Sequence, residues 1–345
     1  MRCRSVSYVV LTVLFFVFAL IPAVAFAGLG PFRLPALGAG EFIRTVPAFA
    51  TPFSDSYQGR IELGMDVRWL NTWVHNVEPE SASGWGNGQD TSELKYGSFL
   101  YDVETLAFTP SILYRANDRL TFGFQLPVAI QGGGVLDGLI EGFHSMIGVG
   151  QHGRDEWPRD SSHYMFVDRD DVVHDKSDQI KRFLTGDVQV SASMLVSQWP
   201  MLTARAIVKL PTSRIYDDQE NSGTDVTLQG IWSWQWGPVA GYHGVGSTFY
   251  TRSGDDDLDL ERFRFSTLNS FEYMTSESFS WVLSMNSASK VADYPELDKP
   301  VVELTMGFKT ILGPGVLEFG IIENLFFFDN SPDAGVQLGY TLKLM

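Results

Sequence analysis

Hydrophobic and polar residues alternate with a period of two over most of the chain after residue 57. Segment 61–69 shows the pattern most clearly: its odd positions are apolar, and Glu62, Asp66 and Arg68 stand between them. Successive side chains of a β-strand point to opposite faces, so this segment is predicted to form a strand with one apolar and one polar face.

The same alternation recurs along the rest of the sequence and predicts about twelve strands. Segments 106–114 and 120–130 are separated by Asn117 and Asp118, which favour a tight hairpin turn. The remaining segments are 188–196, 202–210, 226–236, 239–250, 260–273, 279–285, 302–312, 317–327 and 336–344.

The connections between these segments alternate between short and long. The short ones lie at 117–118, 198–201, 237–238, 275–277 and 313–315. The long ones run over 77–99, 131–182, 212–224, 251–258, 287–299 and 328–334. Outer-membrane barrels combine an even strand count, short periplasmic turns and longer outer loops. The predicted fold class is therefore all-β: a transmembrane, antiparallel, up-and-down β-barrel over residues 57–345, with a short helix in the second outer loop.

A soluble β-sandwich would also show alternating strands. It would not require outward apolar faces, loops that are long on one side only, or an export signal. Trp69, Trp73, Trp232 and Trp236 lie near predicted strand ends, where the aromatic girdles of membrane barrels are found. These features favour the membrane barrel.

The first 27 residues are typical of a secretory signal peptide. Arg2 and Arg4 precede an apolar run over 9–20, and Ala25-Phe26-Ala27 matches the small-x-small pattern of a cleavage site. The apolar run is shorter than the roughly 20 residues that span a bilayer, which disfavours a retained anchor. We therefore expect export to the outer membrane of a Gram-negative cell, a mature chain beginning at Gly28, and a periplasmic extension over 28–56.

Cleavage would also remove Cys3, the single cysteine of the chain. The mature protein would then have no disulfide, no thiolate metal site and no cysteine nucleophile, although its compartment permits disulfides.

The composition agrees with a folded barrel. Of 345 residues, 44% are hydrophobic and 19% are charged, which excludes low-complexity disorder. The 33 glycines, 13% aromatic residues and mean hydropathy of −0.01 suit a barrel better than a bundle of membrane helices. The net charge of −16 argues against nucleic-acid binding, which needs clustered Lys and Arg. Expected partners are outer-membrane lipid, lipopolysaccharide and, during insertion, the barrel-assembly machinery.

Acidic residues gather in the predicted loops, as in 168–178 and 255–259. Solvated surface is the simplest role for them. Bridging by divalent cations is the alternative, although 255–259 lacks the glycine that an EF-hand loop requires.

If the apolar faces meet lipid, the polar faces line the lumen. Charges of both signs could pair across the lumen and close it, or could line a narrow wet pore, and the sequence does not decide between these states. The lumen-lining candidates are Glu62, Asp66, Arg68, Arg115, Arg205, Lys209, Arg262, Arg264, Glu303 and Lys309.

An amphipathic helix is predicted over 135–148, within the long outer loop 131–182. Its apolar positions at helical spacing are Leu136, Leu139, Ile140, Phe143 and Ile147, and its opposite face carries Asp137, Glu141 and His144. The helix could pack on the barrel rim, or could fold inward as a plug whose acids meet wall cations such as Arg205, Arg262 or Arg264. The candidates for the loop or plug are Leu136, Asp137, Glu141, Phe143, His144, Arg154, Asp155, Arg159 and Asp160.

Motifs for catalysis or cofactor binding are weak. Segment 148–153 matches the dinucleotide-binding glycine pattern but follows a predicted helix rather than a strand, so no cofactor is expected. Histidines 144, 152 and 163 lie near serines 145, 161 and 162 and could supply a Ser–His hydrolase pair at the rim. Local hydrogen bonding explains them more simply, so we do not expect an enzyme.

Two long motifs resemble the signature of a proteobacterial family called domain of unknown function 3187. The first covers 132–144 with Gly153-Arg154-Asp155 and Arg159-Asp160, and the second covers 322–325 and 328–333. Pro31-Phe32, Pro47 and Pro52 resemble a loose form of the family's opening. The resemblance spans most of the mature chain and implies an envelope β-barrel without assigning an activity.

The sequence therefore supports three functions. The first is a porin-like, narrow pore or uptake channel for small polar solutes. The second is a closed barrel with a structural or surface-interaction role. The third is an outer-membrane lipid hydrolase at the rim.

Overall fold

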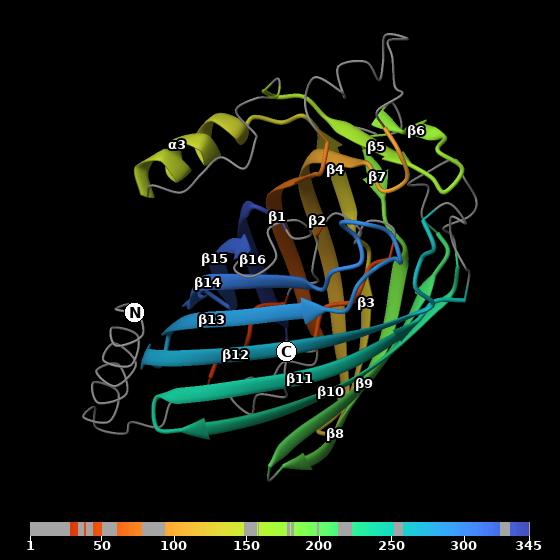
Figure 1. Cartoon of the computed structure of the whole chain (residues 1–345). Helices are drawn as coiled ribbons and strands as arrows, with labels where there is room; N and C mark the ends of the chain where they lie inside the picture. Colours follow the sequence, from red (N-terminus) through yellow and green to blue (C-terminus); the bar gives the residue numbers. More distant parts are fainter. Residues whose placement is uncertain are drawn as a thin grey trace, which may run out of the picture.

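The structure is a computed structural model, drawn as a ribbon in Figure 1. It describes residues 28–33, 38, 44–49, 61–77, 94–147, 157, 159–177, 180, 183–198, 200–212, 223–251, 258–324 and 332–344.

Strands make up nearly all of the regular structure in these ranges. They are β1 (Ile61–His75), β2 (Phe99–Asn117), β3 (Leu120–Gln125), β4 (Val128–Gly132), β5 (His163–Val167), β6 (Val173–Asp175), β7 (Leu184–Thr185), β8 (Val188–Gln198), β9 (Met201–Leu210), β10 (Asp225–Trp236), β11 (Val239–Phe249), β12 (Phe263–Ser276), β13 (Phe279–Ala288), β14 (Val301–Leu312), β15 (Gly315–Asn324) and β16 (Ala334–Leu344). The helix of the described residues is α3 (Asp137–Ile147).

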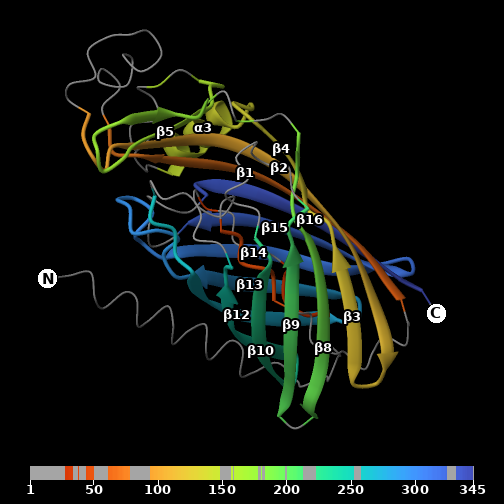
Figure 2. The same cartoon turned by 90° about the vertical axis from the view of Figure 1, so that its right-hand side faces the viewer.

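Twelve antiparallel strands close into a barrel (Figures 1 and 2). Each strand pairs with its neighbour in the sequence, in the order β1, β2, β3, and then β8 through β16. The wall closes where β1 pairs with β16, with Ile61 opposite Leu344. This confirms the predicted all-β barrel and its strand count.

Two strands of the wall are interrupted at the same level. β3 and β4 both pair with β2, and Pro127 lies between them. β7 and β8 pair with β4 and β3 in turn, and Gly186 lies between them. Proline has no N–H to donate to a sheet ladder, so an interruption at this point follows from the sequence. The predicted strand 120–130 is therefore two shorter ones, and the second outer loop contains β5 and β6, which the sequence did not predict.

The outer surface of the wall is apolar and its inner surface is polar. In β10, the outward Leu228 is 53% exposed, whereas the neighbouring inward Gln229 is 5% exposed. Every strand that closes the barrel carries an exposed large apolar side chain of this kind. Such a surface is unfavourable in water and is the usual surface of a barrel in lipid. No helix among the described residues is long and apolar enough to cross a bilayer.

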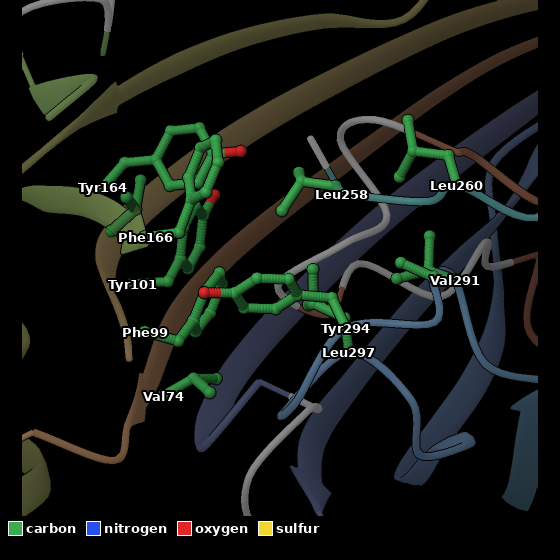
Figure 3. Packing of buried hydrophobic residues seen from close by; sticks show 12 residues of the cluster. Val74, Phe99, Tyr101, Tyr164, Phe166, Leu258, Leu260, Val291, Tyr294 and Leu297 are labelled. Atoms are coloured by element: carbon green, nitrogen blue, oxygen red, sulfur yellow. The ribbon is translucent and has the colours of Figure 1, made fainter. Parts of the chain in front are cut away.

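The two ends of the barrel differ, and we call them the turn end and the loop end. At the loop end, β1 and β2 extend beyond the wall, β2 pairs with β5, and β5 pairs with β6. Buried apolar side chains fill the space between this extension and residues 258–260 and 291–297 (Figure 3). This cluster covers the loop end of the lumen on the β1 and β2 side.

Tyr294 lies within this cluster, in contact with the rings of Phe99 and Phe166. Its hydroxyl donates to the Ser98 carbonyl (2.9 Å) and accepts from the Val167 amide (3.1 Å). Burial raises the pKa of Tyr294 to about 12, so the hydroxyl keeps its proton at neutral pH. The tyrosine thus ties the 291–297 loop to the β2 and β5 extension.

Candidate functional site: a plugged lumen

The lumen contains part of the chain's own N-terminal region. We call residues 28–33 and 44–49 the plug. The amides of Leu29 and Gly30 donate to the Glu272 carboxylate (2.7 and 3.1 Å), and the Lys309 ammonium donates to the Pro31 carbonyl (2.7 Å). Glu272 and Lys309 are inward-facing residues near the turn end, so residues 28–31 lie inside that end of the barrel (Figure 2).

The second half of the plug lies at mid-depth and at the loop end. The Arg264 guanidinium donates to the Arg44 carbonyl (2.6 Å), close to the loop end of β12. The Gln229 amide donates to the Pro47 carbonyl (3.0 Å), and Arg205 donates to the Ala48 carbonyl (3.1 Å). The plug therefore reaches from one end of the lumen to the other.

These contacts share one chemistry: side chains of the wall bind backbone atoms of the plug. The four donors Arg205, Gln229, Arg264 and Lys309 all bind backbone carbonyls. Water can bind the same carbonyls, so the net contribution of each bond is modest: about 0.5–1.5 kcal/mol for the Gln229 amide and about 1.5–3 kcal/mol for each charged donor. The plug is thus held by many exchangeable contacts.

Two aromatic side chains of the plug fit against the wall. Phe49 packs with Ile231 and Leu268, and a Cβ atom built on Gly244 would lie 2.6 Å from the Phe49 ring. Glycine at this wall position therefore makes room for the ring. Phe32 packs against Val282, with the Lys309 ammonium 5.7 Å from its ring centroid.

The remaining wall charges are largely paired with one another. Lys209 lies 3.1 Å from Asp187 and 2.5 Å from Asp225. Arg68 lies 3.3 Å from Glu303, and Lys309 lies 2.8 Å from Glu318. The attraction within each ion pair offsets the free-energy cost of removing both charges from water. The wall can therefore carry these charges although the plug occupies the lumen.

The structure brings most of the predicted lumen residues together. Asp66, Arg68, Arg205, Lys209, Arg264, Glu303 and Lys309 are buried and face the interior. Glu62 is half-buried at the turn end and pairs with Arg33 of the plug (3.1 Å). Arg115 is half-buried at the same end, and Arg262 is exposed at the loop end of β12.

Helix α3 binds the outer side of the wall at the loop end. Asn71 of β1 lies opposite Glu104 of β2 in the register of the sheet. Both residues are on the outward face of the wall, as are Leu63 and Met65. Asn71 donates to the Asp137 carboxylate (3.2 Å), and the Glu104 carboxylate accepts from the amides of residues 135 and 136 (2.8 Å each). The helix is therefore a rim element, and the plug is a different segment.

The acidic side chains of α3 were predicted on the face opposite its apolar stripe, and that assignment is wrong. Asp137 and Glu141 are buried on the same side as Ile140, because Asp137 accepts from the Asp160 amide (2.8 Å) and Glu141 pairs with Arg159. Leu136 is buried beside them. The side chains of Phe143 and His144, and residues Arg154 and Asp155, lie outside the described residues.

The plug was not predicted from the sequence pattern. Residues 28–56 were expected to form a periplasmic extension, and nothing in their pattern marked 28–33 and 44–49 as part of the lumen. The sequence pattern also does not mark Tyr242 and Gln229, which contact or surround the plug, because an inward-facing polar residue has the same pattern whether it meets water or a plug.

The described residues contain no group of three or more His, Cys, Asp or Glu side chains able to hold a metal ion. A serine and a histidine do meet at the rim: the Ser161 hydroxyl lies 3.1 Å from Nε2 of His163. Burial lowers the pKa of His163, which favours its neutral form.

Comparison with known proteins identifies the family. The family model of DUF3187, described as a protein of unknown function, matches residues 8–344. The chain belongs to the DUF3187 family. This confirms the resemblance seen in the sequence motifs, and no curated protein matches the chain.

Solved structures with a similar arrangement are barrels of low sequence identity. The CymD monoaromatic hydrocarbon channel has a TM-score of 0.43 and 11% identity, covering 93% of this chain and 95% of its own. The Ralstonia pickettii toluene transporter TbuX has a TM-score of 0.40 and 11% identity, covering 83% and 89%. LpxR from Salmonella typhimurium has a TM-score of 0.38 and 8% identity, covering 82% and 100%. Matches with TM-scores this low assign no function to this DUF3187 member.

Proposed function

We propose that this protein is an outer-membrane channel for small polar solutes whose lumen is closed at rest by the plug. One observation carries the proposal: a separate segment, and not only side chains of the wall, lies inside the lumen. In a barrel with only a structural role, the side chains of the wall could fill the lumen by themselves. A segment bound through backbone carbonyls can leave the lumen without unfolding the wall.

The chemistry of the wall supports polar rather than apolar solutes. The buried inward side chains include hydroxyls, amides and ion pairs, such as Thr227, Gln229, Ser270, Asn286 and Gln337. Removal of the plug would expose these groups to water. Cross-lumen charges of both signs would then favour small solutes that carry hydrogen-bonding groups over apolar ones.

The double variant Arg205→Ala/Gln229→Ala tests this function. It removes one neutral donor, at about 0.5–1.5 kcal/mol, and one charged donor, at about 1.5–3 kcal/mol, so the open fraction should rise roughly 30-fold or more. Planar-bilayer recordings of purified protein should show more frequent openings than the wild type. Thr227→Val is the matched control, because Thr227 is an inward residue of the same strand that bonds Thr248 (2.9 Å) and has no described contact with the plug.

A double variant that inserts and folds like the wild type yet shows no added current would contradict the channel. The result would favour the closed barrel with a structural or surface-interaction role, since loosening a plug in a non-conducting barrel has no electrical consequence.

The hydrogen bond between Ser161 and His163 favours a second candidate, a lipid hydrolase at the rim. A neutral histidine can accept the proton of a serine nucleophile. If the pair is catalytic, Ser161→Ala should lower fatty-acid release from lipopolysaccharide or phospholipid by a factor on the order of 100. Ser177→Ala serves as control, because Ser177 bonds the Tyr164 amide instead (3.1 Å). Equal fatty-acid release by the wild type and Ser161→Ala would show that Ser161 and His163 do not act as a catalytic pair.

A further inference from the structure

Glu272 is a fully buried carboxylate that has no cationic side chain beside it in the part of the chain that the structure describes. Among the described residues its contacts are the amides of Leu29 and Gly30 and the Tyr242 hydroxyl, which donates to it at 2.6 Å. Two other buried lumen carboxylates do have a cation: Glu303 has Arg68 and Glu318 has Lys309. A buried carboxylate without a cation costs several kcal/mol. A positive charge next to Glu272 would therefore be stabilising.

The residue next to this carboxylate is Gly28. A Cβ atom built on Gly28 would lie 2.7 Å from Oε2 of Glu272 and 2.4 Å from the Tyr242 hydroxyl oxygen. The backbone nitrogen of Gly28 is bonded to the same Cα, so standard bond lengths place it within about 5 Å of the carboxylate. A side chain at position 28 would collide with both groups, so glycine permits this close approach.

We propose that Glu272 and Tyr242 form the binding site for the free α-ammonium group of Gly28, which is created by removal of residues 1–27. A signal peptidase would hydrolyse the peptide bond between Ala27 and Gly28. Water supplies the hydroxyl of the new Ala27 carboxylic acid and a hydrogen for the Gly28 amine. The amine then takes up a proton from solvent, because an α-amino group is mostly protonated at pH 7.

Processing would therefore change the charge at this one position. In the precursor, the Gly28 nitrogen is a neutral amide and supplies no counter-charge to Glu272. In the mature chain, it is an ammonium next to that carboxylate. The first half of the plug would thus bind fully only after the signal peptide has been removed.

Competitive labelling of the α-amine tests the site in the mature, detergent-solubilised protein. Mass spectrometry first confirms that the chain begins at Gly28. Acetic anhydride is then applied between pH 6 and pH 11, and acetylation of the N-terminal peptide is followed. The ion pair should raise the α-amino pKa by about 1–3 units above its ordinary 7.7–8.0.

Glu272→Gln should return the α-amino pKa to the ordinary range. Glu62→Gln is the matched control, because it removes the partner of Arg33 elsewhere in the plug and should leave the α-amino pKa raised. If Glu272→Gln fails to fold, an extension by one residue before Gly28 gives the same test, since it moves the ammonium away from an intact Glu272.

A normal α-amino pKa in the wild type, an equal change in Glu62→Gln, or a mature chain that begins elsewhere would each overturn the proposal. The labelling makes no use of ionic current. The N-terminal site and the channel function can therefore fail independently.

Discussion

Deletion of residues 28–49 should turn a closed barrel into a steadily conducting one. Four hydrogen bonds from the wall to the carbonyls of Pro31, Arg44, Pro47 and Ala48 favour the seated plug. Three of the donors are charged, at about 1.5–3 kcal/mol each, and the amide contributes about 0.5–1.5 kcal/mol, so the lumen is open for less than about one thousandth of the time. Removing the plug should therefore raise the mean current in planar bilayers roughly a thousandfold or more.

Deletion of residues 135–148 is the control for this experiment. It removes the α3 region from the outer side of the wall, so the current should stay at the wild-type level. Heat-modifiable migration in electrophoresis should show that both variants remain folded barrels. A folded plug-deletion variant without current would refute the gated channel, and a current that rises only in the α3 deletion would assign the closure to the rim.

Lys209→Met should destabilise the barrel strongly. The substitution leaves the carboxylates of Asp187 and Asp225 buried without their cation, which costs about 3–5 kcal/mol. Urea unfolding in detergent micelles, followed by tryptophan fluorescence, should show a lower midpoint. The additional changes Asp187→Asn and Asp225→Asn should restore much of the loss, because the two side chains that lost Lys209 then carry no charge.

Lys290→Met is the control for Lys209→Met. Lys290 also contacts two carboxylates, those of Glu261 (3.1 Å) and Asp293, but its side chain is 37% exposed. Exposed pairs contribute about 0–1 kcal/mol, so the midpoint should change little. Equal effects of the two substitutions would show that the inward ion pairs are hydrated, and the account of a tightly filled lumen would then be wrong.

The barrel was predictable because lipid and lumen impose opposite requirements on neighbouring residues. In β1, the outward positions 61, 63 and 65 are apolar and the inward positions 62, 66 and 68 are charged, so the period of two is visible in the sequence. The five residues of β5 and three of β6 are too few to show such a period. These strands form because β2 extends beyond the wall and offers them an edge.

The plug was not predictable for a physical reason. The wall binds the carbonyls of Pro31, Arg44 and Ala48, and every residue has a carbonyl, so these contacts leave no mark in the sequence of the plug. The position of α3 shows a second limit. Its amphipathic pattern predicted a helix, but Asp137 and Glu141 are buried, because Asp137 contacts Asn71 of the wall and Glu141 pairs with Arg159 of the same outer loop.

The wide sequence separation of the plug contacts fixes their place in the order of folding. Ala48 is bound by Arg205, 157 residues later, and Pro31 is bound by Lys309, 278 residues later. Synthesis proceeds from the N-terminus, so the plug emerges long before its partners on β9 and β14 exist. Contacts between distant residues form slowly because a long loop must first close. The plug therefore cannot nucleate the barrel, and it cannot be fully seated before β9 and β14 have formed.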